Sequence, residues 1–300
     1  VAAGYLGSTC TWHAGLSGSA PLLMATPKNF MEADAGLVPV SLTTFSAFNL
    51  TLTAVVVAVM VGMLLWLYPS APEPNVPVAE MAVDPHATSS GPGLWIERSY
   101  ALNLVMGVLG ATAFWSLYVE GGSRVSINVL NFGVLFLALL LHPSPLSFTR
   151  AATRGATYLH GIVIQFPFYA GMYGLIKYSG LAEIIARGFT AAASPRTFPL
   201  VIYWYSGLVS LFIPSGGSKW AIEAPYVVAA AKTLAVPIPR AILAYAWGDM
   251  STHFLQPFWA IPLLAIAKVE FKDIIGYLAI LFLVNFVVVS AAFALMPYLL

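Results

Sequence analysis

The most restrictive feature of this chain is where its charges are missing. No Asp, Glu, Lys or Arg occurs in residues 35–72, 99–119, 125–149 or 274–300. Each stretch exceeds the roughly 20 residues that an α-helix needs to cross the hydrocarbon core of a membrane. Charged residues make up only 8% of the chain, against about 25% in soluble domains. The sequence therefore predicts an integral membrane protein with several helical spans.

Composition and motifs also exclude several classes of function. A net charge of +1 gives no basic surface for nucleic acid, and the single Cys10 excludes an internal disulfide framework. The chain has no nucleophile elbow, phosphate loop or Cys/His metal spacing, so neither an enzyme nor a resident cofactor or metal is expected. It begins at Val1 inside apolar sequence without a basic leader, which suggests a fragment of a longer protein.

The predicted fold is an all-α inverted-repeat transporter that is truncated at its N-terminus. Residues 1–68 would be the end of a first repeat, a broken helix plus one span, and residues 69–97 a solvent-exposed linker rich in Pro, Gly and acids. Residues 98–300 would be a complete second repeat. Its expected segments are spans at 99–119, 125–141, 155–178 (kinked at Pro167) and 274–297, an amphipathic helix at 181–193, and a helix over 240–268 interrupted between Gly248 and Pro257.

Residues 198–236 predict a re-entrant hairpin. Two apolar arms flank Ile213–Lys219, and each arm has about 15 residues, which is too few for a comfortable span. Pro214, Gly216 and Gly217 interrupt a regular helix. Irregular backbone at membrane depth is tolerated only where it is buried in protein or lines a cavity.

Two broken segments share a spacing that indicates an internal repeat. Tyr5 and His13 recur as Tyr245 and His253, 240 residues later, and each pair precedes a Pro-Leu-Leu triplet. Paired interrupted segments in two halves of a chain point to the substrate site of a transporter. The first copy has only 20 residues before its triplet, so about 140 upstream residues, including a first re-entrant hairpin, are expected to precede it.

Four motifs carry a resemblance to a known family. They are GLSGSAPLL at 15–23, QFPFYAG at 165–171, PSGGS at 214–218 and QPFWA at 256–260. The chain resembles the bacterial short-chain fatty acid transporters over nearly its whole length. Lys219 and Asp249 stand where the resemblance leads us to expect His and Glu, which leaves the substrate preference and the coupling ion open.

The resemblance implies a multi-pass carrier of the ion transporter superfamily in the bacterial cytoplasmic (inner) membrane. The expected function is uptake of short monocarboxylates such as butyrate or acetoacetate by symport with H⁺ or Na⁺, with an elevator-like motion. The expected partners are the monocarboxylate and the lipid bilayer, and a homodimer is one assembly we consider. The alternatives are a carrier for another anion, such as a dicarboxylate, or a channel or intramembrane enzyme.

Two groups of residues are candidates for the substrate. A helix that starts near Ser218 would direct its free N–H groups and positive dipole end at a carboxylate. Small residues would allow close approach, and hydroxyls would add hydrogen bonds. The predicted substrate site comprises Ser17, Gly18, Ser19, Ser215, Gly216, Gly217, Ser218, Lys219 and Gln256. The alternative, purely structural interpretations are a helix-breaking turn capped by serine and close helix packing.

Charged and titratable residues in the spans are candidates for ion coupling. Lys219 and Glu223 lie four residues apart on one helical face, so Lys219 either contacts the substrate or is neutralised by Glu223. Asp249 precedes Thr252 and His253 at the predicted helix break, where the three could carry a proton or bind Na⁺. Structural hydrogen bonding is the competing interpretation for His13, Asp249 and His253.

Overall fold

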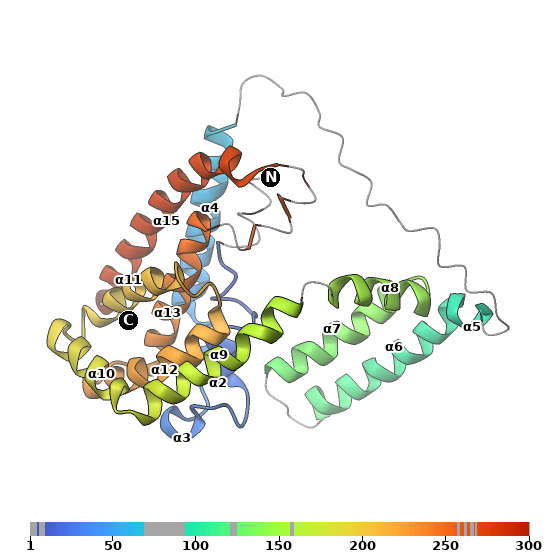
Figure 1. The fold of residues 1–300 in the computed structure, drawn as a ribbon, viewed down its shortest axis with the longest axis horizontal. Helices are drawn as coiled ribbons and strands as arrows, with labels where there is room; N and C mark the ends of the chain where they lie inside the picture. Colours follow the sequence, from blue (N-terminus) through green and yellow to red (C-terminus); the bar gives the residue numbers. More distant parts are fainter. Residues whose placement is uncertain are drawn as a thin grey trace. The chain divides into compact units, whose positions relative to one another are not determined.

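A computed structural model of the chain describes residues 5, 10–68, 94–120, 125–156, 159–256, 259–260, 263–264, 267 and 269–299 (Figure 1). Every regular element among these residues is helical, in agreement with the predicted class. The elements are α2 (Ala20–Ala25), α3 (Glu32–Ala35), η1 (Val40–Leu42), α4 (Ala47–Trp66), α5 (Leu94–Arg98), α6 (Tyr100–Trp115), the π-helical turn η2 (Ser116–Glu120), α7 (Ile127–Leu141), α8 (Pro145–Ala156), α9 (Leu159–Tyr178), α10 (Leu181–Ala192), α11 (Phe198–Ser210), α12 (Gly216–Thr233), α13 (Ile238–Ser251), η3 (Thr252–Leu255) and α15 (Phe271–Leu299).

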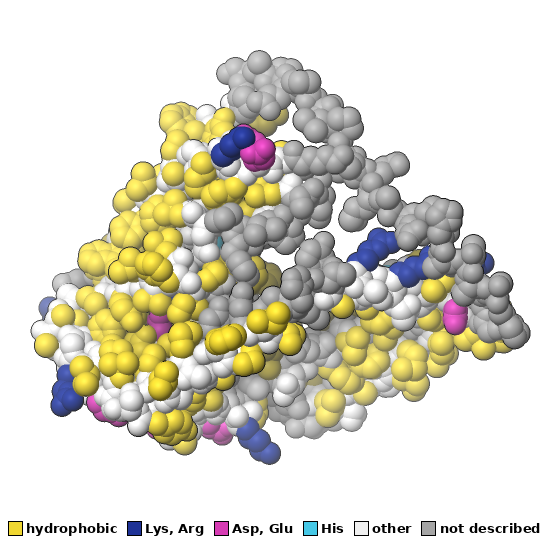
Figure 2. Space-filling view, in the orientation of Figure 1, with side chains coloured by type: hydrophobic (Ala, Val, Ile, Leu, Met, Phe, Trp, Pro, Cys, Tyr) yellow, Lys and Arg dark blue, Asp and Glu magenta, His cyan; other side chains and the backbone are white. Residues whose placement is uncertain are grey.

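Three of these helices are long and apolar enough to cross a membrane. They cover Ala47–Trp66, Tyr100–Tyr118 and Phe271–Met296. All three lie where the charge-free stretches predict them. Helix α7 is shorter than predicted, with 15 residues, because the helix begins only after its cap at Ser126 and ends before His142. Much of the visible surface is hydrophobic, as expected for helices that face lipid (Figure 2).

Serine hydroxyls define the beginnings of four helices. Ser46, Ser99, Ser126 and Ser215 each accept a hydrogen bond from a backbone N–H in the first turn of α4, α6, α7 and α12, respectively. The first N–H groups of a helix have no partner within the helix, so a preceding serine fixes where the helix can start. The structure therefore confirms the predicted break before α12, and the Ser215 cap explains where this helix starts.

The chain divides into two compact units, residues 1–81 with 170–300 and residues 82–169. In the first unit, α13 is the central element, and Ala241–Ser251 are all buried in it. It packs most closely against α11, where a Cβ on Gly248 would collide with the carbonyl oxygen of Tyr203. Small residues let helix backbones approach this closely.

The second unit contains a tight pair of helices, α6 and α7. A Cβ on Gly107 would collide with the Leu140 side chain, and one on Gly110 with the Phe136 ring. At one end of the pair, Tyr100 donates a hydrogen bond to the Leu140 carbonyl oxygen (3.0 Å) and Asn103 donates to that of His142 (3.0 Å). Helix α8 follows directly from this end.

The irregular segments appear close to where the sequence predicts them, although Gly216 and Gly217 begin α12 and α13 continues through Gly248 to Ser251. Residues 10–19 form turns before α2, residues 211–215 separate α11 from α12, and α13 ends at Ser251 in the 3₁₀ turn η3. The Tyr205 and Tyr226 hydroxyls, 3.0 Å apart, join the two arms of the predicted hairpin. Entry and exit on one membrane side and the inverted repeat both stay predictions. The predicted linker lies almost wholly outside the described residues, which resume at Leu94.

Candidate functional site

The site is built where the two irregular segments meet. A Cβ on Gly217 would collide with the carbonyl oxygen of Gly18. A Cβ on Gly216 would lie 2.5 Å from Nδ1 of His13 and 2.8 Å from Oγ of Ser19. Only glycine allows such contact between the first turn of α12 and the segment before α2. Residues about 200 positions apart in the sequence therefore form one crossing, which we call the crossover.

Helix α12 begins at the crossover. Ser215 caps the helix by accepting a hydrogen bond from the N–H of Ser218 (3.4 Å), and the Tyr245 hydroxyl donates to the carbonyl oxygen of Gly216 (2.7 Å). Tyr245 comes from α13, so the central helix holds the tip of the hairpin in place. The positive end of the α12 dipole is directed into the protein interior at this point.

Three buried hydroxyls near the crossover have no hydrogen-bond partner among the described residues. They are Oγ of Ser17, Ser19 and Ser218, and the three side chains are at most 5% exposed. Buried polar groups are normally hydrogen-bonded, because an unpaired one costs about 1–3 kcal/mol. Unpaired hydroxyls beside a helix N-terminus are consistent with a place that a polar ligand can fill.

One turn further along α12, Lys219 lies completely buried among polar groups. Its Nζ donates hydrogen bonds to Oγ (2.6 Å) and to the backbone oxygen (2.9 Å) of Ser206 on α11. It also lies 3.2 Å from Oδ1 of Asp249 and 3.4 Å from Oε1 of Glu223. Lys219, Glu223 and Asp249 are all 0% exposed. The ammonium group is thus shared between two carboxylates instead of being paired with Glu223 alone.

Two histidines complete this buried cluster. Nε2 of His13 lies 3.3 Å from Oδ2 of Asp249, and the rings of His13 and His253 meet edge to face with centroids 4.9 Å apart. The two residues related by the 240-residue spacing therefore lie side by side. Together, Lys219, Glu223, Asp249, His13 and His253 form the buried charge cluster.

The three residues His13, Asp249 and His253 offer ligand atoms within 4.8 Å of one another. Two imidazoles and a carboxylate are donors that suit transition metals. However, the Lys219 ammonium already lies 3.2 Å from the same carboxylate and would repel a divalent cation. We therefore assign no metal to the cluster.

Two of the predicted site residues, Gln256 and Thr252, already make hydrogen bonds to backbone oxygens. The Gln256 amide donates to the Ser210 carbonyl oxygen (3.0 Å), and the Thr252 hydroxyl donates to the Asp249 backbone oxygen (3.4 Å). Both hydrogen bonds hold the break after α13 in shape. The assignment of Gln256 to the substrate and of Thr252 to an ion stays a prediction.

Sequence reasoning missed the residues that position the cluster. Ser206 donates a hydrogen bond to the Tyr245 carbonyl oxygen (2.9 Å) while it accepts one from Lys219. Asn49 of α4 donates to the Ala14 carbonyl oxygen (3.1 Å) and accepts from the Trp247 indole (2.8 Å), and so ties the segment before α2 to α13. The spacing of small residues at Ser206, Gly207 and Ser210 is the one signal that indicates close helix contact on α11.

Comparisons with known proteins agree on one family. The family model described as short chain fatty acid transporter matches residues 1–296. A protein of Escherichia coli (strain K12), provisionally named a short-chain fatty acid transporter, is 36% identical over 289 residues, which cover 92% of this chain and 64% of the relative. A protein of Haemophilus influenzae (strain ATCC 51907 / DSM 11121 / KW20 / Rd) with the same provisional name is 32% identical over 286 residues, 89% of this chain and 63% of the relative.

The chain thus spans just under two thirds of the length of these relatives. No solved structure matches it. The family match over nearly all of the sequence, together with the apolar helices, identifies a membrane protein. The chain belongs to the short-chain fatty acid transporter family.

Proposed function

We propose that the protein containing this chain is a secondary carrier that takes up short-chain fatty acids across the bacterial cytoplasmic membrane. The observation that carries this proposal is the crossover, where two irregular segments meet beside a helix N-terminus with unpaired buried hydroxyls. Transporters of inverted-repeat folds bind anionic substrate groups at such half-helix ends. Family membership supplies the class of substrate.

A carboxylate suits the chemistry of the crossover. Backbone N–H groups in the first turn of α12 and the hydroxyls of Ser17, Ser19 and Ser218 are all donors that a carboxylate oxygen accepts. A hydrogen bond to a charged group contributes about 1.5–3 kcal/mol.

Fixed charges near the crossover favour a monoanion over a dianion. The one ammonium group of the buried charge cluster, on Lys219, is opposed by the two carboxylates of Glu223 and Asp249. Adding one negative charge to a buried region that already carries an excess carboxylate is costly, and adding two is more so. A short monocarboxylate accompanied by one cation is the cargo that fits best.

The donor set favours a proton as the accompanying cation. Na⁺ prefers oxygen ligands such as carboxylates and backbone carbonyls, whereas His13 and His253 present imidazole rings to Asp249. An imidazole nitrogen or a carboxylate oxygen can take up a proton, and the group that gains one would offset the substrate's negative charge. We therefore extend the proposal to H⁺ symport, with His13, Asp249 and His253 as the proton-binding group.

Uptake of labelled butyrate by cells that express the full-length protein tests the proposal. We expect accumulation above the level of cells with an empty vector, and inhibition by unlabelled propionate and acetoacetate but not by succinate. Inhibition by succinate as strong as that by propionate would instead identify a dicarboxylate carrier. Absence of uptake, with the protein present in the membrane, would overturn the fatty-acid assignment.

Imposed gradients test the coupling ion separately. In proteoliposomes, an inward proton gradient is expected to drive butyrate accumulation, whereas an inward sodium gradient at constant pH is not. Because butyric acid also crosses lipid in its neutral form, liposomes without protein provide the baseline. Accumulation driven by sodium alone would contradict the proton assignment and leave the substrate assignment intact.

A further inference from the structure

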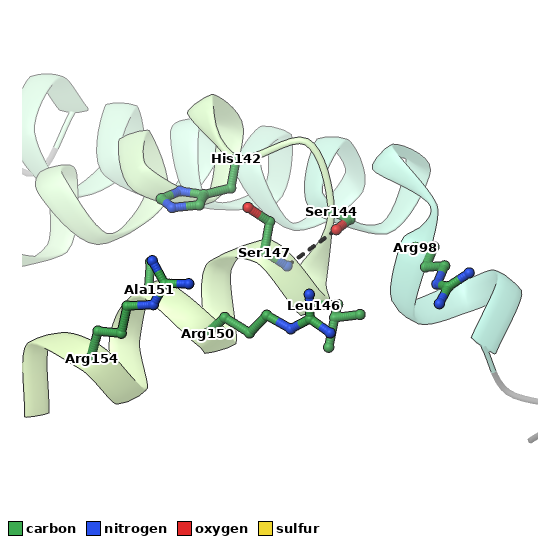
Figure 3. Close-up of a pocket in the computed structure, with 8 residues that line it drawn as sticks. All are labelled: Arg98, His142, Ser144, Leu146, Ser147, Arg150, Ala151 and Arg154. Carbon is green, nitrogen blue, oxygen red and sulfur yellow. Dashed lines mark hydrogen bonds between the residues drawn. The ribbon is translucent and has the colours of Figure 1, made fainter. Parts of the chain in front are cut away.

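The second unit holds a basic cavity that the proposed transport function does not use. It has a volume of about 450 Å³ and is lined by Arg98, His142, Ser144, Leu146, Ser147, Ala151, Arg150 and Arg154 (Figure 3). Three guanidinium groups, one imidazole and two hydroxyls line it, and none of the described lining residues is acidic. The cavity lies entirely within residues 82–169, one compact unit.

Packing at the end of the α6–α7 pair brings these residues together. The hydrogen bonds from Tyr100 and Asn103 to the end of α7 hold the two helix ends side by side, and Arg98 immediately precedes α6. After His142 the chain turns at Ser144, whose Oγ accepts a hydrogen bond from the N–H of Ser147 (3.1 Å), and enters α8. Arg150 and Arg154 are four residues apart on α8 and so lie on one face of it.

The lining is chemically matched to a phosphate group. Guanidinium groups bind phosphate oxygens through paired hydrogen bonds, and serine hydroxyls add further donors. Figure 3 shows Arg150 and Arg154 extending from α8, with Arg98 on the neighbouring α5. Three guanidinium groups among the described lining residues imply a ligand that is an anion with several acceptor oxygens.

The surroundings indicate that this phosphate belongs to a lipid. Helices α6 and α7 expose large apolar side chains along their length, among them Val105, Leu109 and Leu137, which are 54%, 58% and 54% exposed, respectively. The cavity lies at the end of this apolar pair, where a spanning helix meets the headgroup layer. Helix α8 is amphipathic, with Leu146 and Phe148 among its apolar residues, as in helices that lie in the membrane interface.

We propose that the cavity of Arg98, Arg150 and Arg154 binds the phosphate-bearing headgroup of an anionic phospholipid. The three arginines are at one end of the pair, whereas the sequence that connects α6 to α7 contains a single cationic residue, Arg124. Such a bias marks a cytoplasmic side, where anionic lipids attract basic residues. A lipid held here would fix the depth of the second unit in the membrane. The inference stands independently of the transported substrate.

Native mass spectrometry of the full-length protein tests the site. Protein purified in detergent is mixed with phosphatidylglycerol or phosphatidylcholine, and bound lipids are counted. We expect preferential binding of phosphatidylglycerol, and binding weakened on the order of tenfold or more in Arg150→Gln/Arg154→Gln, because each basic residue near an anionic surface contributes measurably to binding.

The matched control is Arg187→Gln/Lys272→Gln, which removes the same charge from exposed positions in the other unit. It is expected to bind phosphatidylglycerol like the wild type. Arg150→Lys/Arg154→Lys changes the same positions but keeps the charge, and it is expected to retain most of the binding. Retained binding would show that the loss in the Gln variant comes from the missing charge and not from a folding defect. Thermal unfolding of all three variants is measured in parallel.

Results of two kinds would overturn the proposal. One is equal binding of the two lipids, or wild-type binding by the Gln variant. The other is displacement of phosphatidylglycerol by inorganic phosphate at constant ionic strength and low millimolar concentration. That outcome would show that the cavity recognises free phosphate and not a lipid headgroup.

Discussion

At the scale of single residues, Lys219 provides the positive charge that two buried carboxylates of the first unit contact. It contacts Asp249 and Glu223 at 3.2 and 3.4 Å, and none of the three is exposed. A buried charge that loses its partner costs far more than the pair contributes when intact. The same ammonium lies 4.2 Å from the centre of the Tyr245 ring, which adds a cation–π contact. In this conformation Lys219 contacts both carboxylates and Ser206, and its assignment to the substrate stays a prediction.

Replacing Lys219 with Met is expected to destabilise the protein by about 3–5 kcal/mol, because two buried carboxylates lose their common partner. Glu223→Gln is expected to cost much less, since Lys219 keeps Asp249 and Ser206 as partners. Thermal unfolding of the full-length protein in detergent, followed by tryptophan fluorescence, measures both. Equal stability of Lys219→Met and the wild type would show that the carboxylates are protonated or separately satisfied.

Asp249 belongs both to the buried charge cluster and to the group that we propose binds the coupled proton. Asp249→Asn is expected to abolish proton-driven accumulation of butyrate while retaining exchange of internal for external butyrate. The reason is that Asn keeps the shape of the side chain and leaves untouched the backbone oxygen that accepts hydrogen bonds from Ser210 and Thr252. Accumulation and counterflow exchange in proteoliposomes measure the two modes. Equal loss of both would indicate a structural role.

At the scale of elements, the crossover depends on two backbones that touch. Gly217 in the first turn of α12 lies against the carbonyl of Gly18, so neither segment can move without the other. The contact joins the predicted end of the first repeat to the predicted hairpin of the second. A side chain at this point would force the segments apart.

Gly217→Ala is therefore expected to reduce butyrate uptake severely, with the protein still inserted in the membrane. Gly62→Ala in α4 is the matched control, because its Cβ would meet nothing within 4 Å and alanine favours the helix by about 1 kcal/mol. Initial uptake rates, normalised to the protein in the membrane, compare the two. Full activity of Gly217→Ala would show that the crossover opens freely.

Local sequence signals predicted the helices and their breaks. They did not predict contacts between residues that are far apart in the sequence. The sequence predicted a helix start near Ser218, and the structure places it at Gly216 with Ser215 as the cap. Four-residue spacing predicted the Lys219–Glu223 pair. The shared ammonium at Asp249 depends on the packing of α11 against α13, for which the sequence gives only a pattern of small residues. Likewise, the repeat spacing singled out His13 and His253 but did not predict that their rings touch.

At the scale of the whole molecule, the sequence predicted a helical membrane protein, and the structure and family agree. Absence of charge located α4, α6 and α15, since that signal depends only on the cost of placing ions in lipid. Helix α7 is two residues shorter than its predicted span because it begins only after the Ser126 cap, whereas its end at Leu141 is where the sequence predicts it. The inverted repeat and the passage of the hairpin through one membrane side stay predictions, since both concern the complete protein.

Binding of labelled butyrate to the purified full-length protein tests the crossover site most directly. Ser17→Ala/Ser218→Ala is expected to weaken binding at least about tenfold, because each lost hydrogen bond to a charged group contributes about 1.5–3 kcal/mol. Its stability should not fall, since both hydroxyls are unpaired in the structure. Ser41→Ala/Ser179→Ala, at exposed positions, is the control and should bind like the wild type. Undiminished butyrate affinity in Ser17→Ala/Ser218→Ala would contradict the assignment of the substrate to the crossover.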